Sequence, residues 1–296
     1  MKKKIKNIIK KAPGFNKLNL LRVRINYFLK DDETVIREKY KSVFGKELNL
    51  ENPKTFNEKI QWRILKERKE IYTQLADKYL VRDYIKEKIG EEYLIKLLGV
   101  YQRVEDIDYD KLPNKFVLKC NHDSGSTIIC QDKLTFNKKE TNKKLNFFLK
   151  RNFYYTTREW HYKNIRSLII CEELLIPKRG ELCDYKFHCF NGKIEIIQVT
   201  NSSHTGNNMY SSDWKLLPFR YLNENHSEKK IPVKLEEMKK IVAKLSKDFN
   251  YVRVDLYECN DKVYFGELTF TPNAGCGKFI PEKWDNFYGE KINVKK

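Results

Sequence analysis

The sequence contains no apolar run close to the roughly 18 to 20 residues that a membrane-spanning helix needs, although it is 296 residues long. We therefore exclude a transmembrane protein. Six lysines lie within the first eleven residues, but no apolar stretch follows them, so we expect no secretory signal peptide. The seven cysteines include no C-x-x-C pair, which argues against a disulfide framework and a zinc site. We expect reduced thiols in a cytoplasmic protein.

Acidic residues are absent from positions 1–30, which contain ten lysines or arginines. Over the whole chain, basic residues exceed acidic ones by 59 − 40 = 19, so this segment holds about half of the excess. A solvated basic arm accounts for the segment without any function. The alternative is an anionic partner, such as an acidic polymer, nucleic acid or the headgroups at the inner face of a membrane.

Repeats and low-complexity tracts are absent too, and the chain is 41% hydrophobic and 13% aromatic. That composition supplies a core and excludes global disorder. Thr55 and Glu58 have the spacing of a capping box, and a further helix is expected over 77–89 with Asp77 as its N-cap.

The second half is richer in strand patterns. The turn Asn191-Gly192 joins the patterns at 184–190 and 193–200 into a hairpin. Two further strands are expected at 251–258 and 263–270. Helices together with hairpins predict an α+β fold.

Polar residues inside these strands are the candidates for chemistry. Arg253 and Asp255 share one face of the first strand, and Glu267 and Thr269 lie in the second. They could form a plain buried ion network or hold a divalent cation, since carboxylates suit Mg²⁺. Two strand lysines, at 119 and 186, could reach solvent from an edge or bind phosphate. The small residues of loop 121–127 fit either a tight polar turn or an anion site.

Strand register decides whether Asp255 and Glu267 can share a cation. A two-residue loop, Asn260-Asp261, places Asp255 opposite Gly266 and turns Glu267 to the other face. A three-residue loop places Asp255 opposite Glu267. We predict the three-residue loop, or a bulge that restores this pairing, with Mg²⁺ or a lysine as the cation between the two carboxylates.

As a set, these residues resemble the TupA-like ATP-grasp family of cell-surface polysaccharide gene clusters. The resemblance covers about residues 40 to 285. The stretches that carry it are NPKTFNEKIQW (52–62), DKYLVR (77–82), KFVLKCNH (115–122), DYKF (184–187), VRVDLY (252–257) and FGELTFTP (265–272).

The resemblance implies an ATP-grasp-like fold that holds ATP and Mg²⁺ between two β-containing subdomains. It divides the chain into a basic helical region (1–76), a smaller subdomain with a flap loop (77–170) and a C-terminal subdomain with the metal site (171–296). By position in the family pattern, the resemblance implies that the phosphate ligands are Lys78, Lys119 and Lys186, and that the flap residues are Ser124, Gly125 and Ser126. It implies an adenine hinge made of Glu172, Glu173, Leu174 and Leu175. The implied catalytic residues are Arg253 and Lys186, and the implied metal ligands are Asp255, Glu267 and Thr269. Thr269 departs from the family pattern, which often has Asn there as the third metal contact.

The activity that the resemblance implies is an ATP-dependent carboxylate–amine ligase. It would form an amide on the carboxylate of a uronic acid through an acyl-phosphate, with an amine or amino acid as second substrate, during capsular or other surface polysaccharide synthesis. The alternative is a glycosyltransferase or phosphoryl transferase of surface glycans that uses the same nucleotide site. A nucleic-acid binder is a remote third reading, because the carboxylates embedded in the strands argue against it.

Overall fold

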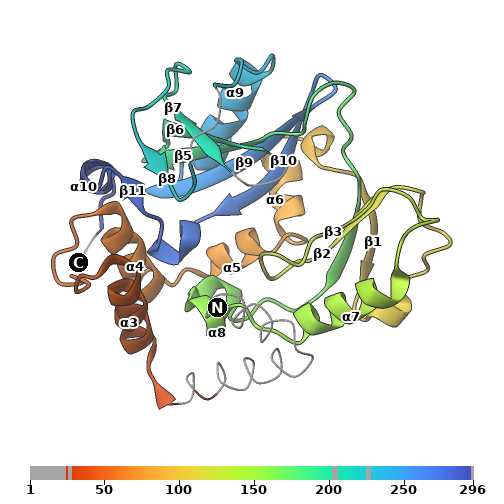
Figure 1. Ribbon diagram of the computed structural model, residues 1–296, viewed down its shortest axis with the longest axis horizontal. Helices are drawn as coiled ribbons and strands as arrows, with labels where there is room; N and C mark the ends of the chain where they lie inside the picture. Colours follow the sequence, from red (N-terminus) through yellow and green to blue (C-terminus); the bar gives the residue numbers. More distant parts are fainter. Residues whose placement is uncertain (1–24, 26–28, 202–205, 225–227, 295–296) are drawn as a thin grey trace, which may run out of the picture.

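The structure, a computed structural model, describes residues 25, 29–201, 206–224 and 228–294. In the described residues, helices surround two larger antiparallel sheets and one two-stranded ribbon, which confirms the predicted α+β class (Figure 1). The basic segment 1–30 lies almost entirely outside the described residues. Within the described ranges, no helix is both long and apolar enough to cross a membrane.

The smaller sheet has four strands. In spatial order they are β1 (Leu97–Tyr101), β4 (Ile169–Glu173), β2 (Phe116–Cys120) and β3 (Ile128–Cys130). Three consecutive residues of β4, at 169–171, are fully buried, because this strand lies between two others and is covered on its faces. Helix α7 (Lys138–Leu149) packs its Leu145 into the same core. The predicted boundary between 170 and 171 falls inside β4; the division into subdomains stays a prediction.

The larger sheet has five strands. In spatial order they are β10 (Lys262–Thr269), β9 (Tyr251–Cys259), β5 (Asp184–Phe190), β6 (Lys193–Thr200) and β7 (Asn207–Tyr210). Helix α9 (Leu235–Ser246) covers one face (Figure 1), where Met238 and Val242 pack against strand residues such as Phe187 and Val254. Alternation along the strands turns polar side chains to the opposite face. That face carries the candidate site.

Two hairpin predictions are tested by the backbone. Asn191 and Gly192 have φ values of 50° and 76°, so the predicted two-residue turn between β5 and β6 is confirmed. The three-residue loop between β9 and β10 is wrong, because Cys259 pairs directly with Lys262. Asn260 and Asp261 both adopt left-handed φ, of 52° and 63°, which matches the twist of a two-residue hairpin.

The bulge that we gave as the alternative is present. The register shifts between Phe265 and Glu267, so Gly266 is the extra residue and Glu267 lies opposite Asp255. Phe265 therefore pairs with Leu256 and Leu268 with Val254, and all four face the core. Because of the bulge, the apolar residues of β10 face the core while Glu267 faces the opposite, polar side of the sheet.

The remaining helices frame the two sheets. They are α3 (Asp32–Phe44), α4 (Phe56–Lys66), α5 (Glu70–Ala76), α6 (Val81–Lys88), α8 (Tyr154–Thr157) and α10 (Lys283–Glu290), with short 3₁₀ turns at Glu91–Tyr93, Val104–Asp106, Trp160–Tyr162 and Pro272–Gly275. A small ribbon pairs β8 (Arg220–Tyr221) with β11 (Phe279–Ile280).

The starts of two of these helices test the sequence predictions. The capping box of α4 is confirmed, since Thr55 and Glu58 bond each other's backbone reciprocally. The helix predicted over 77–89 begins only at Val81. Asp77 instead closes a turn by accepting from the backbone N–H groups of Tyr79 and Leu80 at 2.7 and 3.2 Å, and this turn presents Lys78.

Candidate functional site

A cleft lies between the two sheets and gathers most of the predicted site. One wall is formed by Lys78, Lys119 and loop 123–127, and the other by residues of β5, β9 and β10. Eight of the predicted residues line it: Lys78, Lys119, Ser124, Gly125, Ser126, Lys186, Asp255 and Glu267. Arg253, Thr269 and the predicted hinge 172–175 do not line this cleft.

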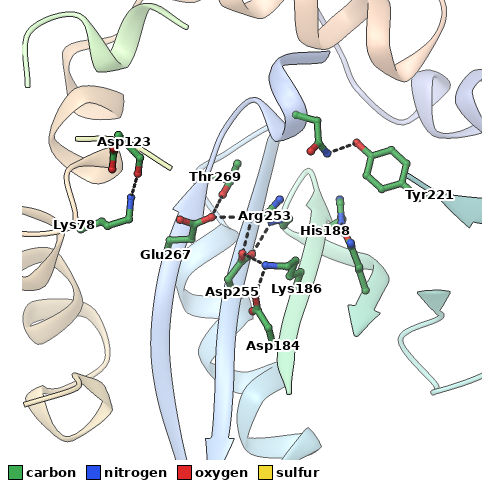
Figure 2. A network of polar contacts seen from close by, with 12 residues as sticks. Lys78, Asp123, Asp184, Lys186, His188, Tyr221, Arg253, Asp255, Glu267 and Thr269 are labelled. Atoms are coloured by element: carbon green, nitrogen blue, oxygen red, sulfur yellow. Dashed lines mark hydrogen bonds and ion pairs between the residues drawn. The ribbon is translucent and has the colours of Figure 1, made fainter. Parts of the chain in front are cut away.

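The predicted flap is anchored at its base. Asn121, His122, Asp123 and Ser126 are all buried, whereas Ser124 and Gly125 form an exposed tip and Thr127 is exposed beyond it. Lys78 donates from Nζ to the Asp123 carbonyl oxygen at 2.5 Å (Figure 2). Ser126 donates to Asp123 Oδ1 at 2.6 Å and accepts from the backbone of Cys120. Motion of the whole loop 121–126 therefore conflicts with this packing, and the flap role stays a prediction.

The predicted hinge contains an ion-pair residue. Glu172 is buried and its two carboxylate oxygens contact Lys119 at 2.6 Å and Arg82 at 3.2 Å. Its neighbour Glu173 is exposed and donates its backbone N–H to the Lys96 carbonyl. Glu172 thus fixes the position of Lys119 at the edge of the cleft, while Leu174 and Leu175 are half-buried.

A chain of alternating charges crosses the polar face of the larger sheet (Figure 2). Its members, in order, are Asp184, Lys186, Asp255, Arg253, Glu267 and the hydroxyl of Thr269. Arg253 bonds Asp255 with two nitrogens, at 2.7 and 2.6 Å, and reaches Glu267 Oε1 at 2.8 Å. A cation does lie between the two carboxylates, but it is the guanidinium of Arg253 and not the Mg²⁺ or lysine that the sequence analysis expected.

Burial and neighbouring charges have opposite effects on the pKa values of the carboxylates in this charge chain. Burial alone would raise the pKa of Asp255, but Arg253 and Lys186 outweigh it and hold that pKa below its usual value. At Asp184 burial prevails over the attraction of Lys186, and the pKa is raised. Burial and nearby Arg253 lower the pKa of His188 to about 3, so this histidine is neutral. Neighbouring carboxylates with opposite shifts are a feature of functional sites.

The donor set of the predicted metal site is chemically suitable for Mg²⁺. Asp255 and Glu267 offer carboxylate oxygens, and Thr269 donates its hydroxyl to Glu267 at 2.9 Å. A further carboxylate oxygen in the cleft, Asp184 Oδ1, is buried without a hydrogen-bond partner. Hard oxygen ligands are those that Mg²⁺ prefers, so the residues fit. In the described part of the chain, no three His, Cys, Asp or Glu side chains form a group that could hold a metal ion as they stand; Arg253 and Lys186 contact the carboxylates.

Gly266 is required by close packing. A Cβ at this position would lie 3.0 Å from the Asp255 carbonyl oxygen and 3.0 Å from Tyr257 Cε2. We expect Gly266→Val to destabilise the protein by about 1–3 kcal/mol through overpacking, with a smaller loss for Gly266→Ala. Urea unfolding of both variants measures this; equal stability of Gly266→Val and wild type would contradict the tight bulge.

Sequence analysis missed the clamp that α4 forms on the segment after β10. Asn57 exchanges two hydrogen bonds with the backbone of Gly277, at 2.7 and 3.1 Å. Gln61 donates to the carbonyls of Ala274 and Gly275 at 2.8 and 3.1 Å. Both side chains are fully buried, and their place in the FNEKIQW stretch is the signal that could have revealed them.

A second missed residue is Glu159, which accepts a hydrogen bond from the Thr271 hydroxyl at 2.5 Å. Burial raises its pKa to about 7. A carboxyl whose folded pKa is raised binds more protons when folded, so stability falls as pH rises between about 4.5 and 7. We expect Glu159→Gln to flatten this fall, which is on the order of 3 kcal/mol at most. Urea midpoints at pH 5 and pH 8 measure it; an unchanged pH dependence in the variant would contradict the assignment.

Comparison with known protein families identifies the family of this chain. The model of the TupA-like ATP-grasp family matches residues 58–293. The protein belongs to this family. The TupA-like ATP-grasp family predicted from the sequence is thereby confirmed.

Solved structures match this chain at low identity. A D-alanine–D-alanine ligase from Bacillus anthracis in complex with ATP is 19% identical, with a TM-score of 0.39, over 67% of this chain and 54% of that one. The D-alanine–D-alanine ligase from Helicobacter pylori is 17% identical, with a TM-score of 0.38, over 74% and 61%. The ATP-grasp ligase PsnB, solved with a precursor peptide and AMPPNP, is 9% identical, with a TM-score of 0.38, over 76% and 56%.

This chain thus spans between half and two thirds of the length of these ligases. A comparison with curated proteins finds no match.

Proposed function

We propose that the protein is an ATP-dependent carboxylate–amine ligase that forms an amide on the carboxylate of a uronic acid during surface polysaccharide synthesis. One observation carries the proposal: four members of the charge chain face Lys78 and Lys119 across a single cleft, namely Asp184, Lys186, Asp255 and Glu267. Cations on both walls suit a triphosphate, and carboxylates on one wall suit its metal. Family membership supports the same chemistry.

The nucleotide is assigned to this cleft. Lys78, Lys119 and Lys186 would bind the phosphates, and the backbone near Ser124 and Gly125 would cover them. Adenine would lie towards the hinge 172–175. Bound at Asp255 and Glu267, with Thr269 beside them, Mg²⁺ would supply positive charge to the phosphate oxygens.

The reaction has two steps in this proposal. A carboxylate oxygen of the sugar takes the γ-phosphoryl group, which gives an acyl-phosphate and ADP. The amine then attacks the acyl carbon, and phosphate and a proton leave. Arg253 would stabilise the charge that develops at the phosphoryl and acyl groups, and a dry cleft would protect the acyl-phosphate from water.

The acceptor is an acidic sugar or glycan, and the second substrate is a small amine or amino acid. A chain with a formal net charge of +19 attracts an acidic acceptor. We place the reaction in the cytoplasm. Contact of residues 1–30 with anionic headgroups at the inner face of the membrane belongs to the same proposal, and nucleic acid is not a partner in it.

Product analysis tests this function. Purified protein is incubated with ATP, Mg²⁺, a panel of uronic acids and a panel of amines. We expect ADP to form only when a carboxylate and an amine are both present, with an amide as product. ADP formation with a sugar that has no carboxylate would instead indicate phosphoryl transfer, and release of a free nucleotide from a nucleotide sugar would indicate a glycosyltransferase.

A further inference from the structure

Asp184 begins β5 and is 7% exposed. Its Oδ2 accepts from Lys186 Nζ, and its Oδ1 is buried without a hydrogen-bond partner. Removing a carboxylate from water is unfavourable unless a partner offsets the loss. In the described residues, the ammonium of Lys186 is the ion-pair partner that directly contacts Asp184, while Arg253 acts on it without direct contact.

Lys186 lies between two carboxylates that differ in their other partners. Its Nζ is 3.0 Å from Asp255 Oδ2, and it also contacts Asp184. Asp255 has Arg253 on both oxygens. A metal ion that binds Asp255 must therefore compete with two cations already there, in a buried site where charge interactions are strong.

We propose that Asp184 is a positioning residue that retains Lys186 when Asp255 exchanges the lysine for a metal ion. With Asp184 present, the ammonium can leave Asp255 and turn towards phosphate while it keeps one charge-assisted bond. Without Asp184, Asp255 is the only carboxylate among the described residues that still contacts Lys186, and the lysine competes with the metal. This inference rests on the proposed function, which assigns the metal to Asp255 and Glu267.

Two substitutions then act in opposite directions on binding of Mg²⁺ alone. Asp184→Asn should weaken it about tenfold, within the roughly 10- to 100-fold range of residues that support metal ligands. Lys186→Met should strengthen it, because a competing cation is gone, and should weaken binding of ATP. Glu181→Gln is the matched control: Glu181 lies three residues before Asp184 but pairs with Lys229, so no change is expected.

A double-mutant cycle separates positioning from simple charge. If Asp184 acts through Lys186, Asp184→Asn should change Mg²⁺ affinity less than about twofold when Lys186→Met is already present. If its negative charge attracts the metal directly, the tenfold loss persists in that background. The double variant also removes both members of the pair, so it leaves no unpaired buried charge that could prevent folding.

The measurement is Mg²⁺ binding to the apo protein, followed by the shift of the unfolding midpoint with Mg²⁺ concentration, and checked by the bound fraction of Mn²⁺ in its magnetic resonance spectrum. A tenfold loss in Asp184→Asn that disappears with Lys186→Met supports the inference. An equal loss in both backgrounds, or none in either, overturns it while the ligase proposal stands. Absence of Mg²⁺ and ATP binding in the wild type would overturn both.

Discussion

Replacing Arg253 by methionine should reduce turnover about 10³-fold or more, within the range seen when an arginine is removed from a phosphoryl-transfer site. The buried guanidinium does not itself line the cleft, but it bonds Asp255 and Glu267, which do, and from there it would stabilise charge that develops in both steps. ATP affinity should change only a few-fold, because Lys78 and Lys119 remain. Turnover is measured as ADP formation with the carboxylate–amine pair that the wild type uses, and ATP affinity by thermal shift.

Stability and its dependence on Mg²⁺ form a second measurement, which distinguishes loss of the arginine's role from misfolding. Without Arg253, Asp255 and Glu267 repel each other across paired strands, so Arg253→Met should be less stable than wild type and should gain more stability from Mg²⁺. Lys291→Met is a suitable control, because Lys291 pairs with Glu195 outside the cleft. Turnover of Arg253→Met within tenfold of wild type would contradict the role given to this arginine.

Replacing Asp255 by asparagine should have the second large effect. Its carboxylate contacts both Arg253 and Lys186, so the substitution removes the proposed metal ligand and leaves two buried cations with fewer partners. We expect turnover to fall by more than the roughly 100-fold upper range of residues that only support a ligand. Loss of one partner of a buried pair is expected to destabilise by about 3–5 kcal/mol.

Dependence on Mg²⁺ distinguishes loss of a ligand from loss of fold. Folded Asp255→Asn, verified by its circular dichroism, should show no stabilisation by Mg²⁺ alone, whereas Glu258→Gln should respond as wild type does. Glu258 is three residues further along β9 and outside the cleft. Wild-type Mg²⁺ stabilisation in Asp255→Asn would place the metal elsewhere.

Alternation of residue types predicted which side chains share a face, and the structure confirms that part of the site. Asp255 and Glu267 do lie opposite each other, but a bulge at Gly266 achieves this rather than a longer turn. Register of this kind depends on packing across the sheet, because Phe265 and Leu268 must both reach the core. The turn residues alone allow both loop lengths.

Partners far apart in the chain could not be predicted from local pattern. Glu172, expected at the hinge, contacts Lys119 and Arg82. The place of Asp184 beside the charged residues of β9 follows from the pairing of β5 with β9. The clamp of Asn57 on Gly277 joins residues 220 positions apart. Such contacts follow from tertiary packing, whereas the hairpin at Asn191 and Gly192 follows from the conformational preferences of two adjacent residues.

Transfer of oxygen from the sugar carboxylate to phosphate tests the central claim most directly. The sugar is prepared with ¹⁸O in both carboxylate oxygens and incubated with ATP, Mg²⁺, the amine and the protein, and the released phosphate is analysed by mass. An acyl-phosphate route predicts one ¹⁸O atom in each phosphate released and one in the amide, with ADP formed in equal amount. Phosphate without ¹⁸O, or product formed without release of phosphate, would contradict the ligase mechanism.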